Sequence, residues 1–196
     1  MRLPAPLEGY VNDRFGSKRG LLNRLRARLR CLLGDYRQHR EVDFSRVTRL
    51  VFICSGNICR SPFGAFYARE KGLEVDSCGL HTRGGDPADP RAVAFAERLG
   101  IDMTPHRTKN ISDYEPCPGD LLLVMEPGQY EELEALARRE GWPSSIQLSI
   151  LPLFGQPPSP YLHDPYSATD AFFDHCERQV MAAVDGIAQR MEGTVQ

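Results

Sequence analysis

The chain has 196 residues, of which 41% are hydrophobic, enough for one domain with a sizeable core. The formal net charge of −2 is the sum of a basic and an acidic part. Residues 1–49 hold 12 Lys/Arg against 5 Asp/Glu, and residues 50–196 hold 12 Lys/Arg against 21 Asp/Glu. An acidic body excludes nucleic acid as the main partner, since phosphate backbones attract basic surfaces.

The sequence also bears on the cellular location of the protein and on whether it binds a metal or a cofactor. We see no secretory signal near the N-terminus, and no apolar run long enough to span a membrane. Six cysteines in such a context indicate reduced thiols, which predicts a cytoplasmic location. The cysteines include no Cys-x-x-Cys pair and the five histidines no pair at helical ligand spacing, so we expect neither a metal nor a cofactor.

The first 46 residues are expected to form a basic extension ahead of a main domain at 47–194. Residues 1–20 carry prolines and glycines without periodicity and are predicted to be irregular. From about residue 20 to residue 33, leucines follow one face and arginines fill the other positions, which predicts an amphipathic helix that ends at Gly34. Such a helix suits a membrane surface, a partner protein, the acidic body of its own chain or solvent, and these alternatives stay open.

From residue 47 onward, strand patterns alternate with helix patterns. Strands are predicted at 51–53, 73–78, 121–125 and 146–151, and helices at 61–71, 89–99, 129–139 and 168–191. The alternation predicts an α/β fold, with a parallel sheet that carries helices on both faces. In such sheets the active site lies beyond the carboxyl ends of the strands, where the first strand delivers Cys54.

The loop after the first strand carries the strongest chemical signal. It reads Cys-Ser-Gly-Asn-Ile-Cys-Arg-Ser-Pro over residues 54–62. Backbone N–H groups that curl into a helix N-terminus form a nest for an anion, and the helix dipole adds positive potential. Gly56 lets the backbone curl, and Asn57 tolerates a left-handed conformation.

The same loop offers a nucleophile and a phosphate clamp. A cysteine beside a helix N-terminus and an arginine favours its thiolate form, which makes Cys54 the candidate nucleophile. Arg60 presents a planar fork that matches two phosphate oxygens, and Ser61 can donate a hydrogen bond to the sulfur. A bare Cys-x5-Arg arises by chance around a buried cysteine, but the strand, the Gly-Asn pair and the Ser-Pro helix start favour function. The predicted phosphate-binding residues are Ser55, Gly56, Asn57, Ile58, Cys59 and Ser61.

This loop resembles the signature of the low-molecular-weight protein tyrosine phosphatases. The similarity spans about residues 47–191 and includes the motifs Asp76-Ser77-Cys78-Gly79, Ala88-Asp89-Pro90-Arg91-Ala92, Gly100-Ile101, Val124-Met125-Glu126 and Asp164-Pro165-Tyr166. The resemblance implies a small four-stranded parallel sheet with the phosphate loop after the first strand. It also implies a phosphoric monoester hydrolase that dephosphorylates protein tyrosine through a phosphocysteine, without a metal. The expected partner is a phosphotyrosine protein, with a tyrosine kinase as one candidate.

Three residues take their roles from this resemblance. Asp164 alone could be an ordinary Asp-Pro turn, but the family's loop makes it the general acid and base. Tyr166 matches an aromatic wall for the substrate ring, or else packs in the core. Cys59 could form a reversible disulfide with the nucleophile, or be a small buried side chain. Residues 80–83 lack the aromatic that often forms the opposite wall, and His81 could partly replace it.

Other functions compete with this interpretation. Thioredoxin-coupled arsenate reductases share the loop but need two further cysteines on a mobile segment, and this chain has only isolated cysteines there. Protein-arginine phosphatases resemble the chain but carry threonine where Ile58 stands. A phosphate-binding module without catalysis is disfavoured, because Cys54, Arg60, Ser61 and Asp164 are all present.

Overall fold

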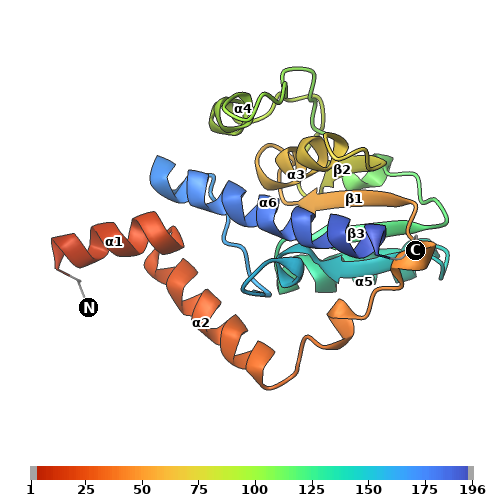
Figure 1. Cartoon of the computed structure of the whole chain (residues 1–196), viewed down its shortest axis with the longest axis horizontal. Coiled ribbons are helices and arrows are strands. Elements are labelled where there is room, and N and C mark those ends of the chain that lie inside the picture. The colour runs from red at the N-terminus through yellow and green to blue at the C-terminus, as the bar shows by residue number, and fades with distance from the viewer. Residues whose placement is uncertain (1–3, 194–196) are drawn as a thin grey trace.

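A computed structural model describes residues 4–193 of the chain (Figure 1). Its sheet contains four parallel strands in the order β2-β1-β3-β4. The strands are β1 (Arg49–Cys54), β2 (Val75–Gly79), β3 (Asp120–Val124) and β4 (Gln147–Ile150). The helices are α1 (Ala5–Phe15), α2 (Lys18–Leu32), α3 (Arg60–Arg69), α4 (Pro90–Glu97), α5 (Pro127–Glu140) and α6 (Asp170–Glu192). The predicted α/β fold with a four-stranded parallel sheet is confirmed.

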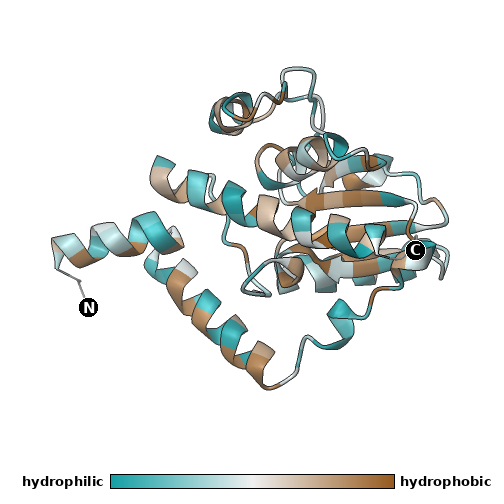
Figure 2. Ribbon diagram, in the orientation of Figure 1, coloured by the Kyte–Doolittle hydropathy of each residue, from teal (hydrophilic) through white to brown (hydrophobic). Residues whose placement is uncertain are grey.

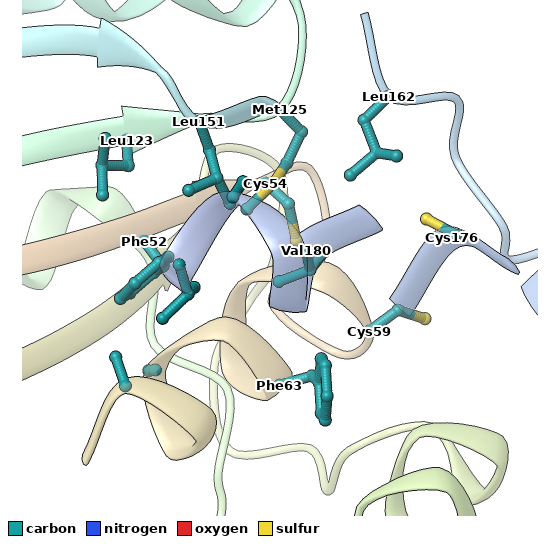
Figure 3. Packing of buried hydrophobic residues seen from close by; sticks show 14 of the residues in the cluster. Phe52, Cys54, Cys59, Phe63, Leu123, Met125, Leu151, Leu162, Cys176 and Val180 are labelled. Atoms are coloured by element: carbon teal, nitrogen blue, oxygen red, sulfur yellow. The ribbon is translucent and has the colours of Figure 1, made fainter. Parts of the chain in front are cut away.

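Helices cover both faces of the sheet, so its central strands are buried on both sides. Because side chains alternate along a strand, Leu50 and Phe52 of β1 pack in a core with α3 and α6. Val51 and Ile53 point the other way, into a core with Leu133 of α5. Figure 3 shows the first core, where Phe52 faces side chains of α3 and α6.

The active-site loop lies where β1 meets α3. The strand ends at Cys54, and the helix begins six residues later at Arg60. Pro62 falls within the first turn of α3, where a missing N–H costs nothing. The carboxyl ends of the parallel strands therefore present the Cys54–Arg60 loop at one edge of the sheet.

The N-terminal extension is more ordered than its sequence indicates. The prediction that residues 1–20 are irregular is wrong, because α1 covers Ala5–Phe15 and α2 begins at Lys18; residues 1–3 lie outside the described residues. Pro4 and Pro6 sit at the helix start, where prolines are tolerated. Gly16, at φ 76°, ends α1 and turns the chain into α2.

The extension packs beside the rest of the chain rather than apart from it; we call residues 47–193 the body. Helix α1 contacts α6, and α2 runs from that contact out past the edge of the sheet (Figure 1). The predicted boundary at residue 46 stays a prediction, and residue 194, the end of the predicted main domain, lies outside the described residues. Over residues 4–193, no helix has the length and apolar character needed to cross a membrane.

Candidate active site

Cys54 ends β1 at the start of the loop and is 2% exposed. Its sulfur makes two close contacts. It is 3.0 Å from Ser61 Oγ, and the backbone N–H of Asn57 donates to it over 3.3 Å. Ser61 Oγ in turn accepts from the Asn57 side-chain amide at 2.9 Å. The Ser61 hydroxyl proton then has two acceptors within reach, the Cys54 sulfur and the Cys78 carbonyl oxygen at 3.4 Å.

Asn57 holds the loop in shape. It adopts a left-handed conformation, with φ 54°, and is fully buried. Its side-chain amide also donates to Ser77 Oγ at 3.0 Å, and its side-chain oxygen accepts from the Lys109 N–H at 2.9 Å. These last two hydrogen bonds fix the curl of the loop against β2 and the segment before η3 (Ile111–Asp113).

The loop's carbonyl groups are bonded to neighbouring segments rather than to one another. The Cys54 carbonyl accepts from the Leu80 N–H and the Ser55 carbonyl from the His81 N–H. The Ile58 carbonyl accepts from the Asp89 N–H. Within residues 4–193, the N–H groups of four loop residues have no protein acceptor; these residues are Ser55, Gly56, Ile58 and Cys59. Free donors next to a helix N-terminus are what a phosphate group requires.

Arg60 is the largest polar side chain in the interior and is 1% exposed. One guanidinium nitrogen lies 2.9 Å from the Asp164 carboxylate, and the other donates to the Leu162 carbonyl oxygen at 2.9 Å. Burial lowers the pKa of the guanidinium, but Asp164 and Cys54 nearby more than offset this, so the pKa is raised. Arg60 therefore keeps its positive charge beside the Cys54 sulfur.

These residues surround a pocket of about 250 Å³. Its lining consists of Cys54, Ser55, Gly56, Ile58, Cys59, Arg60, His81, Asp164 and Tyr166. Tyr166 is 61% exposed, which excludes the alternative that it packs in the core. His81 lines the same pocket, and its ring is 3.4 Å from Glu132; its role as a partial substitute for an aromatic wall stays a prediction. A larger cavity, of about 550 Å³, lies between α5 and residues 110–114 and contains none of the predicted site residues.

Comparison with known proteins agrees with this geometry. The family model of the low molecular weight phosphotyrosine protein phosphatases matches residues 49–196. A low molecular weight protein-tyrosine-phosphatase of Acinetobacter johnsonii, Ptp, is 31% identical over 137 residues, which cover 69% of this chain and 92% of that protein. This chain belongs to the low molecular weight phosphotyrosine protein phosphatase family. The predicted family and enzyme class are confirmed.

Further relatives extend the comparison. Etp of Escherichia coli K12 is 28% identical to this phosphatase over 145 residues, covering 72% of this chain and 93% of Etp. The structure of Wzb from Vibrio vulnificus in complex with benzylphosphonate superposes with a TM-score of 0.59 at 26% identity, over 73% of this chain and 98% of that one. The arginine phosphatase YwlE from Geobacillus stearothermophilus gives a TM-score of 0.62 over 74% and 94% of the two chains. At 22% identity, this last likeness shows the fold alone.

Several residues of the phosphatase site carry no catalytic signal in the sequence. His106 donates from its ring to the Asn57 carbonyl oxygen at 2.8 Å, and burial lowers its pKa, which keeps it neutral. Gln129 of α5 donates to Ser55 Oγ at 3.2 Å, and the Leu162 carbonyl bonds Arg60. Among the residues that support the loop, only Ser77, which bonds Asn57, lies in a motif that the family resemblance marks. Residue type and spacing do not identify His106, Gln129 or Leu162 as parts of the site.

Cys59 is not in a disulfide in this phosphatase, and neither are the other cysteines. Its side chain is buried, and burial raises the pKa of its thiol. A protonated buried thiol is a poor nucleophile, so Cys59 does not compete with Cys54 for the phosphate. Both alternatives for Cys59, a small core side chain and a redox partner of Cys54, stay predictions.

Proposed function

We propose that this phosphatase hydrolyses phosphotyrosine in proteins through a phosphocysteine on Cys54, with Arg60 binding the phosphate and Asp164 as general acid and base. The observation that supports this most strongly is the meeting of all three groups at one pocket. Cys54 and Arg60 come from the loop after β1, whereas Asp164 comes from a segment more than a hundred residues later.

In the first step, the Cys54 thiolate attacks phosphorus, so that a sulfur–phosphorus bond forms and the bond to the tyrosine oxygen breaks. Asp164 gives its proton to the departing phenolate oxygen. The loop N–H groups and Arg60 stabilise the charge that gathers on the remaining phosphate oxygens. These groups supply the positive field, so the proposed reaction uses no metal.

In the second step, a water oxygen attacks the phosphorus of the phosphocysteine. Asp164, now a carboxylate, accepts a proton from this water, and the bond to sulfur breaks. Ser61 stabilises the returning thiolate, because its hydroxyl lies 3.0 Å from the sulfur. The products are inorganic phosphate and the enzyme in its starting state.

Phosphotyrosine fits the pocket better than phosphoarginine does. Ile58 puts an apolar side chain at the pocket wall and Tyr166 an exposed ring, both suited to a flat phenyl group. A guanidinium would instead need polar acceptors there. Faster hydrolysis of a phosphoarginine peptide than of the matching phosphotyrosine peptide would overturn this choice. Among phosphotyrosine proteins, a tyrosine kinase is one candidate substrate, and we place the reaction in the cytoplasm because a thiolate nucleophile needs reducing conditions.

Rapid-quench hydrolysis of p-nitrophenyl phosphate without added metal tests the two catalytic roles. Wild type should release a burst of phenolate, because the phosphocysteine forms before it is hydrolysed. Cys54→Ser should show neither burst nor turnover. Asp164→Asn should be slower by about 10²-fold or more, since it loses its acid.

Two outcomes would count against the proposal. Turnover that survives in Cys54→Ser would exclude this cysteine as the nucleophile. An inactive wild type that oxidises thiols when arsenate is added would favour the reductase alternative.

We further propose that α2 contacts an anionic lipid surface. The helix carries six Lys/Arg and no acidic residue. Four of its leucines and the leucine that follows it are 46–79% exposed: Leu22, Leu25, Leu29, Leu32 and Leu33. At about 100° per residue they fall in a stripe about 100° wide, opposite the buried Gly20 and Ala27 and flanked by arginines. Figure 2 shows bands of hydrophobic and hydrophilic residues along α2, which extends past the body. Apolar residues between cations suit the boundary between acyl chains and lipid phosphates.

Vesicle pelleting tests this contact. The full chain should pellet with vesicles that contain phosphatidylserine, less so at high salt, and not with phosphatidylcholine alone. The double variant Leu25→Gln/Leu29→Gln keeps every charge and should lose most of the binding. Leu99→Gln, at an exposed leucine of the catalytic body, is the matched control. Equal binding by the double variant would contradict the proposal, and a dimer that this variant abolishes would replace the lipid with a second copy.

A further inference from the structure

The segment that carries Asp164 faces two ways. Residues 161–164 form no helix or strand, and their contacts lie on two sides. Asp164 and the Leu162 carbonyl contact Arg60 on the catalytic side. Tyr161 and His163 instead contact the N-terminal extension. The extension therefore touches the back of the same segment whose front holds the general acid.

The turn between α1 and α2 is shaped to receive the His163 ring. A Cβ added at Gly16 would come within 2.5 Å of His163 Cδ2 and 2.9 Å of the Phe172 ring. A Cβ at Gly20 would come within 2.0 Å of the Phe15 carbonyl oxygen and within 2.9 Å of the same His163 atom. Two glycines thus allow an approach that no other residue permits, and both belong to the extension.

A chain of hydrogen bonds joins the extension to His163. The Asn23 amide donates to the Tyr161 hydroxyl over 3.2 Å, and that hydroxyl lies 2.8 Å from His163 Nδ1. His163 Nε2 lies 3.2 Å from Ser17 Oγ, which also accepts from the Gly20 N–H. One assignment satisfies every link: the Tyr161 hydroxyl donates to Nδ1, and a neutral His163 donates from Nε2 to Ser17. Burial, followed by the charge of Arg60, lowers the pKa of His163 and favours this neutral form.

We propose that the N-terminal extension positions Asp164 for catalysis, by holding His163 between the Gly16–Gly20 turn and the Asn23–Tyr161 hydrogen bond. His163, Tyr161, Asn23 and Ser17 are positioning residues that act through Asp164 and do not touch the substrate. The inference rests on the proposed role of Asp164 as general acid.

Two pairs of variants within the extension of the full chain test it. Gly16→Ala drives a methyl group into His163, and Gly34→Ala is its control, because Gly34 has a similar positive φ of 93° but a Cβ there meets only Arg37. Asn23→Ala removes the donor to Tyr161. Asn12→Ala on α1 is its control, because the Asn12 side chain bonds no other described residue.

The readout is the ratio of kcat/KM for p-nitrophenyl phosphate to kcat/KM for phenyl phosphate. Phenolate is the poorer leaving group and depends more on a correctly placed acid, so a displaced Asp164 raises the ratio. A variant that is only less stable lowers both values equally, because the ratio does not depend on the concentration of folded enzyme. We expect a rise of roughly tenfold for Gly16→Ala and roughly threefold for Asn23→Ala, with both controls at the wild-type ratio.

Asp164→Asn separates failure of the inference from failure of the proposed function. If this variant raises the ratio by about 10²-fold while Gly16→Ala and Asn23→Ala keep the wild-type value, Asp164 is the acid and the extension does not position it. If Gly34→Ala or Asn12→Ala raises the ratio as much as its partner, the effect is not specific to His163 and the inference is also wrong. If Asp164→Asn leaves the ratio unchanged, the proposed acid is wrong and the inference falls with it.

Discussion

Glu177 is a buried carboxyl group with no evident partner. It lies on α6 beside Cys176, is fully buried, and neither of its oxygens has a hydrogen-bond partner among the described residues. Burial raises its pKa to about 8, and the positive charge of Arg60 only partly opposes this. At neutral pH the folded protein therefore holds this carboxyl group largely in its protonated form.

This group should make stability fall as pH rises. An unfolded chain releases the Glu177 proton near its ordinary pKa of 4.5, whereas the folded chain keeps it to about 8. Its contribution is thus fully present below about pH 4.5, declines as pH rises, and is lost above about pH 8. We expect Glu177→Gln to remove a fall on the order of 4 kcal/mol in the free energy of unfolding across this range.

Urea unfolding at intervals from about pH 5 to about pH 8 measures this difference. Glu70→Gln, at an exposed glutamate after α3, is the control and should keep the wild-type slope. Since other titrating groups are common to all three proteins, only the difference in slope counts. Parallel curves for wild type and Glu177→Gln would show that Glu177 is ionised in the folded state.

Single residues of the site differ in how far the sequence foretells them. The left-handed conformation of Asn57 was predictable, because few other residue types tolerate it in a Gly-Asn turn. Its bonds to Ser77 and Lys109 were not, since they depend on how β2 and a distant loop pack against β1. Residue chemistry thus predicted the candidate reacting groups, and tertiary packing selected the groups that hold them.

At the scale of elements, a glycine in the middle of α6 illustrates how packing overrides propensity. Gly186 lies in a helix interior, where glycine costs about 1 kcal/mol relative to alanine. A Cβ there would press into the Phe154 carbonyl oxygen of η4 (Leu151–Phe154), closer than real Cβ atoms approach. The glycine lets α6 lie against the end of β4, so it is needed for contact rather than for flexibility.

Gly186→Ala should therefore destabilise the protein by about 1–3 kcal/mol, although alanine is the better helix former. Gly128→Ala at the start of α5 is the matched comparison, because a Cβ there meets nothing within 4 Å. We expect it to be neutral or stabilising by a few tenths of a kcal/mol. Urea denaturation of both variants measures the difference, and a Gly186→Ala protein as stable as wild type would show that α6 shifts without cost.

The elements of the catalytic body follow from sequence periodicity, while those of the extension follow only in part. After Arg49 and Asp120 at their first positions, β1 and β3 are continuously apolar, as expected for parallel strands covered on both faces. Helix α1 was missed because prolines and glycines were read as breakers, yet Pro4 and Pro6 begin the helix and Gly9 lies exposed within it. The position of a proline within an element carries more information than its presence.

At the scale of the whole molecule, the path of the extension could not be predicted from local pattern. Ser17 meets His163 across 146 residues of sequence, and Asp13 meets Thr169 across 156. Neither pair has a spacing rule, because each depends on where α6 begins and how α1 crosses it. The charge contrast between extension and body favours such an association without specifying its geometry.

The segment that links the extension to the sheet is itself held down. Tyr36 is buried against α5 and β4, and the His39 carbonyl accepts a hydrogen bond from Ser149. The Asp43 backbone exchanges two hydrogen bonds with the Gln147 side chain, at 2.8 and 2.9 Å. The extension is thus attached near β4 as well as at His163 and α6.

This double attachment sets an effective concentration. A segment tethered over a short, fixed link meets its site as if present at roughly millimolar concentration, whatever the amount of protein in the cell. The Gly16–Gly20 turn therefore stays on His163 even if its own affinity is modest, and a free peptide of the same sequence could not displace it at ordinary cellular levels. Any ligand that frees His163 competes with this covalently attached segment, so the apparent Kd of the ligand is raised.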